Sequence, residues 1–169
     1  MIRRLLPLLF LAALAAPPAG AELRTLRWPD LIPDALADVP LAPPPPAHGG
    51  FGENLEQLSP WGDVAFEDLL VTDLDGVEVR ISGYVVPLDL AADDRVREFL
   101  LVPYFGACVH VPPPPPNQVI HVTSEEGLAV ERIYEAWSVT GTLRVEASES
   151  ALASAGYAIA AEDVKLYGS

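Results

Sequence analysis

The clearest alternation of hydrophobic and polar residues occurs in the stretch "DGVEVRISGYVVPLD". Val77, Val79 and Ile81 are separated by single polar residues, which is the period of a half-buried β-strand. The Asp-Gly pair before this run is a turn signal. Gly83 interrupts the alternation, so we expect a bulge or a bend there before the strand continues to Val86.

Four further segments carry strand patterns. "EFLLVPYF" is apolar, "NQVIHVT" is rich in β-branched residues, and "EAWSVTGTLRVEAS" has Gly141 at its centre. The last segment holds Tyr157 and Ile159, and we expect it to end in a short amphipathic turn at Tyr167. Short strands with glycines inside them and little helix predict a mainly β fold, namely a small OB-like closed or partly open β-barrel with an irregular N-terminal segment. A β-sandwich is the competing architecture.

The composition of the first residues predicts where the protein is located. Two arginines precede an apolar run of about twelve residues, which is too short to span a bilayer, and Ala19 and Ala21 then form an A-x-A cleavage pattern. We therefore expect residues 1–21 to be a signal peptide and the protein to be periplasmic. Residues 22–62 are predicted to be an irregular, proline-rich segment, and residues 63–169 a β-barrel domain.

The charge of the chain narrows the range of partners. The formal net charge is −14, so the surface repels nucleic-acid phosphates and anionic lipid headgroups. We therefore expect no nucleic-acid partner. No later segment is long and apolar enough for a transmembrane helix, so no membrane span is expected in the mature chain.

The residues most able to bind a metal or to react lie in the stretch "FGACVHVPPPPPNQVIHV", which contains the single cysteine of the chain. If "CVHV" is extended, Cys108 and His110 project from the same face, because strand residues two apart share a face. The five prolines form a stiff arm without backbone donors, which we expect to project from the surface. Asn117 can then turn the chain and bring His121 beside the first two residues.

A thiolate and two imidazoles form a donor set for zinc or copper. The sequence thus predicts a metal site at Cys108, His110 and His121. Copper is the rival to zinc, but the usual axial methionine is missing because Met1 leaves with the signal peptide. A tetrahedral zinc ion needs a fourth ligand, and the candidate carboxylates are Asp89, Asp94 and Glu98.

Two other interpretations of the same residues stay open. Cys108 could be a small buried hydrophobic residue, which is a common role for a free cysteine. It could also be a nucleophile with His110 or His121 as its base and Asn117 as the residue that orients that base. Whether the protein is an enzyme is therefore undecided, with a non-enzymatic role favoured. His48 lies beside two glycines and is expected to be exposed and without a role.

The motifs "SGYVVPLD", "EFLLVPYFGACVHVPPPPPNQVIHV" and "WSVTGTL" resemble an exported bacterial family of unknown function, DUF3299. The resemblance runs from about Leu74 to Tyr167. It implies a periplasmic protein or a lipoprotein, although this chain lacks the lipid-acceptor cysteine. Some members are associated with zinc-responsive transport genes, which favours zinc over copper. The resemblance implies no established reaction.

The expected function is a periplasmic metal-binding protein, with zinc as the metal, that acts as an accessory in metal homeostasis or envelope transport. The alternative is a metal-free interaction module that docks on an envelope transport complex through its poly-proline arm, because such segments bind aromatic-lined grooves.

Overall fold

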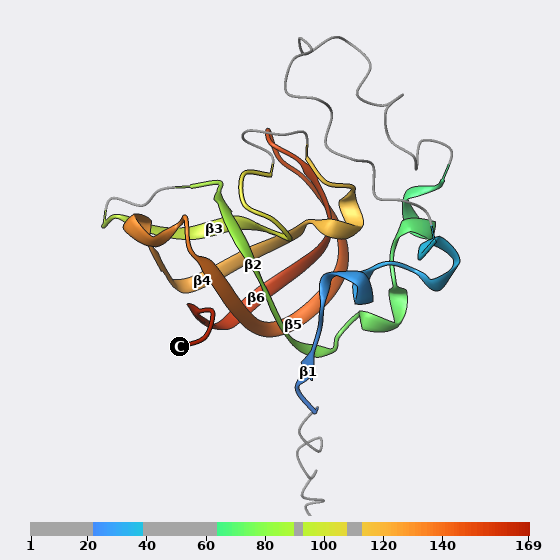
Figure 1. The fold of residues 1–169 in the computed structure, drawn as a ribbon, viewed down its shortest axis with the longest axis horizontal. Helices are drawn as coiled ribbons and strands as arrows, with labels where there is room; N and C mark the ends of the chain where they lie inside the picture. Colours follow the sequence, from blue (N-terminus) through green and yellow to red (C-terminus); the bar gives the residue numbers. More distant parts are fainter. Residues whose placement is uncertain (1–21, 39–63, 90–92, 108–112) are drawn as a thin grey trace, which may run out of the picture.

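The computed structural model describes residues 22–38, 64–89, 93–107 and 113–169, and these ranges are mainly β (Figure 1). They contain no α-helix, and short 3-10 turns connect the strands. The strands are β1 (Arg24–Thr25), β2 (Glu78–Pro87), β3 (Arg95–Val102), β4 (Ile120–Ala129), β5 (Ala136–Glu149) and β6 (Ser154–Leu166). The 3-10 turns are η1 (Trp28–Leu31), η2 (Asp34–Leu36), η4 (Phe66–Leu69), η5 (Thr72–Leu74), η6 (Pro116–Gln118) and η7 (Val130–Arg132).

Five of the strands close into a small barrel, which confirms the predicted OB-like fold. The neighbours run β2-β3-β4-β6-β5, and β5 returns to pair with β2. β4 and β6 are parallel, whereas the other pairs within the barrel are antiparallel. β1 adds a short parallel pairing to β2 beside the barrel. A closed barrel has no unpaired strand edge as long as each strand pairs with both of its neighbours along its whole length. β4 and β6 pair along only part of their lengths.

Gly83 and Gly141, the two glycines expected inside strands, have different roles. At Gly141 the register of β5 against β6 shifts, which is the bulge that a tight barrel corner needs. At Gly83 the pairing of β2 with β5 is regular, so this pair has no bulge there. A Cβ at Gly83 would instead lie 2.6 Å from the carbonyl oxygen of Val102 and 2.8 Å from the ring of Trp28, so this glycine allows close packing.

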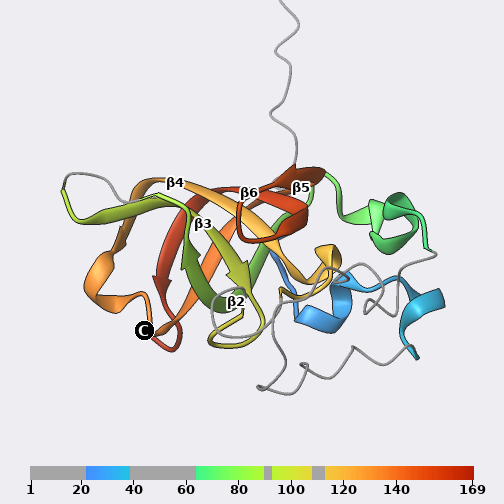
Figure 2. The same ribbon diagram turned by 90° about the horizontal axis from the view of Figure 1, so that it is seen from above.

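The interior of the barrel is one apolar cluster to which all five barrel strands contribute. Tyr157 is fully buried at one end of it and links the barrel to the turns beside it. Its hydroxyl donates to the carbonyl oxygen of Leu31 at 2.9 Å and accepts the backbone N–H of Val71 at 2.8 Å. Burial raises the pKa of Tyr157, so the phenol stays protonated and can donate. The two hydrogen bonds of Tyr157 thus join the barrel to η1 and to the segment between η4 and η5. Figure 2 shows η1, η2, η4 and η5 together at one side of the barrel.

A second, smaller cluster lies on the outside of the barrel wall. Along β3, Phe99 and Leu101 belong to the interior cluster, whereas Leu100 and Val102 belong to the second one. Successive residues of a strand face opposite sides, so this second cluster is on the outer face. It also includes residues from the segments that follow β3 and β5; its buried members are Val86, Leu100, Val102, Ala107, Val119, Ala153 and Ala155.

The structure corrects two other expectations. The last strand continues to Leu166, where an amphipathic turn was expected after Ile159. Of the four described prolines of the arm, Pro114 is buried and only Pro113 is exposed, so this part of the run packs against the body instead of projecting. The predicted signal peptide (residues 1–21) and most of the predicted proline-rich segment lie outside the described residues, so the domain boundaries stay predictions.

Candidate functional site

His121 is the one predicted metal ligand that the structure describes. It lies on β4 opposite Leu100 of β3 and beside Ala158 of β6. Its neighbours along the strand, Ile120 and Val122, are buried in the interior cluster, so the imidazole is on the outer face. Its side chain is 23% exposed, which leaves it accessible to a ligand. His121 therefore stands on the same face as the second cluster, next to Leu100.

The imidazole of His121 is held by Glu98 of β3. Nε2 lies 2.9 Å from Glu98 Oε1, and the glutamate side chain is 49% exposed. A carboxylate oxygen accepts a hydrogen bond, so this contact favours the tautomer with the proton on Nε2. The lone pair is then on Nδ1. Glu98 was one of the three carboxylates considered for a fourth ligand, and the structure brings it to His121.

The other two carboxylates have different surroundings. Asp89 Oδ1 accepts the backbone N–H groups of Arg97 and Glu98, at 3.1 and 2.8 Å, where the pairing of β3 with β4 is irregular. This side chain stabilises the strand and fixes the backbone of Glu98. Asp94 has a φ of 57° at the start of β3, and its carbonyl oxygen accepts the N–H of Val130. No contact joins Asp94 to His121 among the described residues.

Cys108 and His110 lie outside the described residues, so the predicted convergence of three ligands is not tested. The residue before Cys108 is described. Ala107 is fully buried in the second cluster, to which Leu100 also belongs. Leu100 is in turn the cross-strand neighbour of His121. In the described ranges, no group of three or more histidine, cysteine, aspartate or glutamate side chains is arranged to hold a metal ion.

Asn117 occupies the turn η6, as expected, but as a fully buried residue. Its Nδ2 donates to the carbonyl oxygen of Leu69 at 3.0 Å, and its Oδ1 has no hydrogen-bond partner. Among the described residues no hydrogen bond joins Asn117 to His121. The side chain therefore anchors η6 to η4, and this contact does not support a role in orienting a catalytic base.

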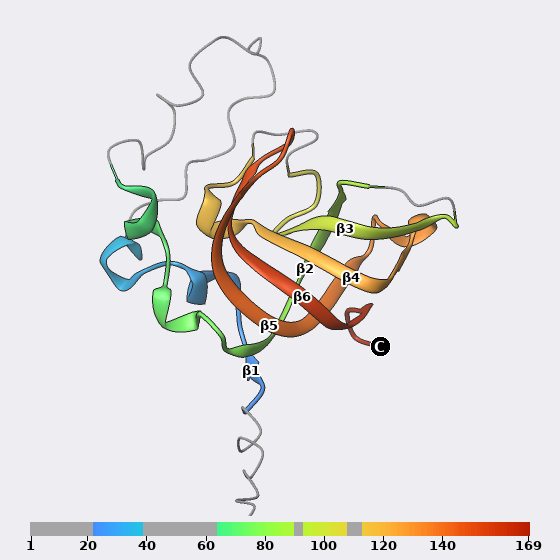
Figure 3. The same ribbon diagram turned by 180° about the vertical axis from the view of Figure 1, so that it is seen from behind.

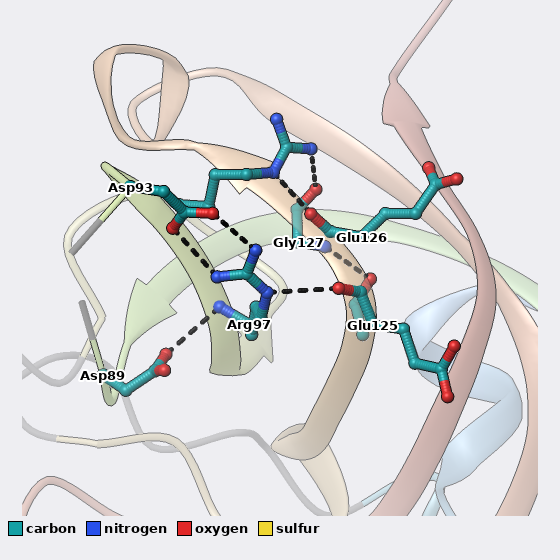
Figure 4. A network of polar contacts seen from close by, with 8 residues as sticks. Asp89, Asp93, Arg97, Glu125, Glu126 and Gly127 are labelled. Atoms are coloured by element: carbon teal, nitrogen blue, oxygen red, sulfur yellow. Dashed lines mark hydrogen bonds and ion pairs between the residues drawn. The ribbon is translucent and has the colours of Figure 1, made fainter. Parts of the chain in front are cut away.

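An acidic depression lies beyond Glu98, and no sequence pattern indicated it. It has a volume of about 780 Å³ and lies over β3, β4 and β6. Arg97, at its rim, pairs with Asp93 at 2.6 Å and donates to the carbonyl oxygen of Glu125 at 3.1 Å (Figure 4). Arg97 holds the pKa of Asp93 at about 2, below its ordinary value of 3.8. The acidic residues that line the depression are Asp89, Glu98, Glu125, Glu126 and Glu162.

The fold and this outer face define a mainly β protein with a small closed barrel, and the comparisons then place it in a family. The model of a protein family of unknown function, DUF3299, matches residues 28–166, so the chain belongs to this family. The crystal structure of a DUF3299 family protein from Pseudomonas aeruginosa PAO1, at 2.45 Å resolution, is 37% identical with a TM-score of 0.65. The match covers 86% of this chain and 97% of that chain.

No curated protein matches this chain. Within the described ranges, no helix has the length and apolar character needed to cross a membrane.

Proposed function

We propose that this protein is a periplasmic zinc-binding protein that acts as an accessory in metal homeostasis or envelope transport. The proposed ligands are Cys108, His110 and His121. The observation that carries the proposal is the contact between His121 Nε2 and Glu98 Oε1 on the outer face of the barrel. A metal-binding histidine commonly donates its other ring N–H to a carboxylate, which orients the ring and raises its basicity.

The placement of the chain around Leu100 supports this proposal. Ala107 packs in the cluster that contains Leu100, and Cys108 follows Ala107 directly in the chain. His121 is the neighbour of Leu100 on the next strand. The residue before Cys108 in the chain and the cross-strand neighbour of His121 therefore belong to the same cluster. Zinc would bind Nδ1 of His121, since Nε2 donates to Glu98, and would keep Cys108 as a thiolate.

The poly-proline alternative has less support. A docking ridge needs an exposed run of prolines, because the partner's aromatic side chains pack against the rings. Pro114 is buried, and Pro115 and Pro116 are half-buried. We therefore prefer metal binding as the function of this region.

The test is the zinc content of the purified protein and of three variants after incubation with zinc and removal of the excess. We expect about one equivalent in the wild type and a loss of most of it in Cys108→Ser and in His121→Ala. The matched control is His48→Ala, which should keep the full equivalent. Titration of the thiol with a colorimetric reagent should detect Cys108 only after chelation.

Equal zinc content in wild type and Cys108→Ser would contradict the proposal, because zinc would then sit elsewhere on the acidic surface. A thiol that reacts fully before chelation would contradict it too. If Cys108 is instead alkylated at mildly acidic pH in the absence of metal, the thiol has a lowered pKa and the enzyme interpretation gains support.

A further inference from the structure

The barrel opens between β4 and β6. The two strands pair in parallel only from Ile120 and Tyr157 to Ser124 and Ala161. β6 then continues to Leu166 and pairs with β5 alone. Figure 3 shows the two strands side by side at one end and apart toward the C-terminus. Within the described ranges, the edge of β6 from residue 162 to residue 166 therefore has no neighbouring strand on the side of β4.

β4 leaves β6 after Ser124, where its residues 124–127 bulge opposite Arg97 of β3, and arginine side chains of β3 bind the carbonyl groups of this bulge. Arg95 donates to the carbonyl oxygens of Glu126 and Gly127, the latter at 2.7 Å, and Arg97 donates to that of Glu125. Three successive carbonyl groups of β4 are thus already satisfied (Figure 4). Of the N–H and C=O groups that alternate residues of β6 direct away from β5, the carbonyl group of Leu166 accepts hydrogen bonds from the backbone N–H and the hydroxyl of Ser169. Within the described ranges, the groups between residues 162 and 164 face no neighbouring strand. An unpaired strand edge is a template for another strand.

The acidic depression lies over this opening and extends into it. Its lining includes Ser124 of β4 and Ala161 and Val164 of β6, which adjoin the interior of the barrel, so the hollow reaches between the strands. The carboxylates of Glu125 and Glu126 extend away from Arg97 (Figure 4). Neither forms an ion pair with a described residue, since Arg97 is engaged by Asp93. Lys165, the one cation of this edge, is paired with Asp163 at 2.8 Å. The opening therefore combines an unpaired edge with the carboxylates of Glu125, Glu126 and Glu162, which form no ion pair with a described residue.

We propose that the edge of β6 from residue 162 to residue 166 binds an extended, lysine- or arginine-rich segment of a partner protein. The peptide adds a strand beside β6, so that main-chain hydrogen bonds provide affinity and its basic side chains meet Glu125, Glu126 and Glu162. The charge of the opening selects a basic occupant and disfavours an acidic one. Glu98 lines the depression and also contacts His121, so the two surfaces adjoin. The residues proposed to meet the peptide include none of the proposed zinc ligands, so neither proposal depends on the other.

Charged residues also protect strand edges from unwanted pairing, and Glu162 would do so against a second copy of this acidic chain. That role does not account for the hollow or for the carboxylates of Glu125 and Glu126 that line it from β4. The two roles differ in a measurable way. A purely protective edge binds no added strand, whereas the proposed edge binds a basic strand and its binding depends on the peptide's own N–H groups.

The test uses the purified protein and a fluorescent peptide of about seven residues that alternates lysine with valine. Binding is measured by fluorescence anisotropy at low and at physiological salt. Two matched peptides serve as probes: one alternates glutamate with valine, and one carries the lysine sequence with alternate amides N-methylated. We expect saturable binding of the basic peptide that weakens with salt, and at least about tenfold weaker binding of each matched peptide.

The variant for this test is the double substitution Glu125→Lys with Glu162→Lys. Its control is Glu131→Lys with Glu146→Lys, which makes the same change of net charge at exposed residues outside the depression. We expect the first variant to weaken binding of the basic peptide by about tenfold, and the control by less than about threefold. In the wild type, the peptide should slow hydrogen exchange of amides between residues 162 and 166.

Equal binding to the two double variants would overturn the proposal, because net charge alone would then explain the affinity. Equal affinity for the N-methylated peptide would overturn it as well, because no strand would be added. Absence of binding to the wild type, or unchanged exchange in residues 162–166, would do the same without any variant. None of these outcomes bears on the zinc content, so this proposal and the proposed function can fail separately.

Discussion

The outer face of β3 and β4 presents two different surfaces. At one end Leu100 and Val102 are buried in the second cluster, which the segments after β3 and β5 help to form. At the other end, Glu98 is half-exposed and Thr123 is exposed, in an acidic depression. The same pair of strands thus provides a packed apolar half and an open charged half. His121 lies at the boundary, where a side chain is both oriented by packing and accessible.

This difference makes the boundary a suitable place for His121 as a proposed zinc ligand. An imidazole in the packed half would be sealed from solvent, and one in the open half would lack a rigid position. Rigid support and partial exposure together are what a metal ligand requires.

The largest effect should come from removing a side chain in the packed half. We expect Leu100→Ala to lower the free energy of unfolding by about 2–4 kcal/mol, because it leaves a cavity in a buried cluster. The matched change in the open half, Thr123→Ala, should cost less than about 0.5 kcal/mol. Urea denaturation measures both. Similar losses for the two variants would contradict the division into a packed and an open half.

The next effect concerns the boundary. We expect Glu98→Gln to weaken zinc binding by about 10–100-fold, because a neutral amide is a poorer acceptor for the His121 N–H. The free energy of unfolding should change by less than about 1 kcal/mol, since the pair is partly exposed. Competition with a chromogenic chelator gives the affinity, and Glu146→Gln is the control. Unchanged zinc affinity in Glu98→Gln would show that Glu98 does not support a ligand.

The smallest effect concerns the ion pair at the rim of the open half. Arg97 lowers the pKa of Asp93 in the folded protein from 3.8 to about 2. The pair therefore stabilises the fold fully above pH 3.8, and this contribution disappears as the pH falls toward 2. We expect Asp93→Asn to make the urea midpoint decline less steeply across this interval. The change should be small because the pair is exposed. Identical acid profiles for wild type and variant would contradict the assignment.

The strands and the barrel were predictable because they depend on local patterns. The alternation of Val77, Val79 and Ile81 and the apolar run in "EFLLVPYF" specify strands without reference to the rest of the chain. The register shift at Gly141 agrees with the expectation that glycines inside strands belong to the corners of a small barrel. The close packing at Gly83 was not predictable, because it depends on Trp28, which is distant in the sequence.

The site was predictable only in part. The metal site at Cys108, His110 and His121 stays a prediction, and for His121 the structure adds that Glu98 reaches its imidazole from the neighbouring strand. This contact depends on the register of β3 against β4, which a sequence pattern does not give. The burial of Pro114 was missed because stiffness says nothing about what the rings pack against. The opening between β4 and β6 depends on where a parallel pairing between distant segments ends.

The most direct test of the central claim is X-ray absorption at the zinc edge on the protein loaded with one equivalent. The account predicts one sulfur scatterer at about 2.3 Å and nitrogen scatterers at about 2.0–2.1 Å, with the sulfur lost in Cys108→Ser. A spectrum with only oxygen and nitrogen neighbours in the wild type would contradict it, because zinc would then be bound by surface carboxylates or histidines without the thiolate.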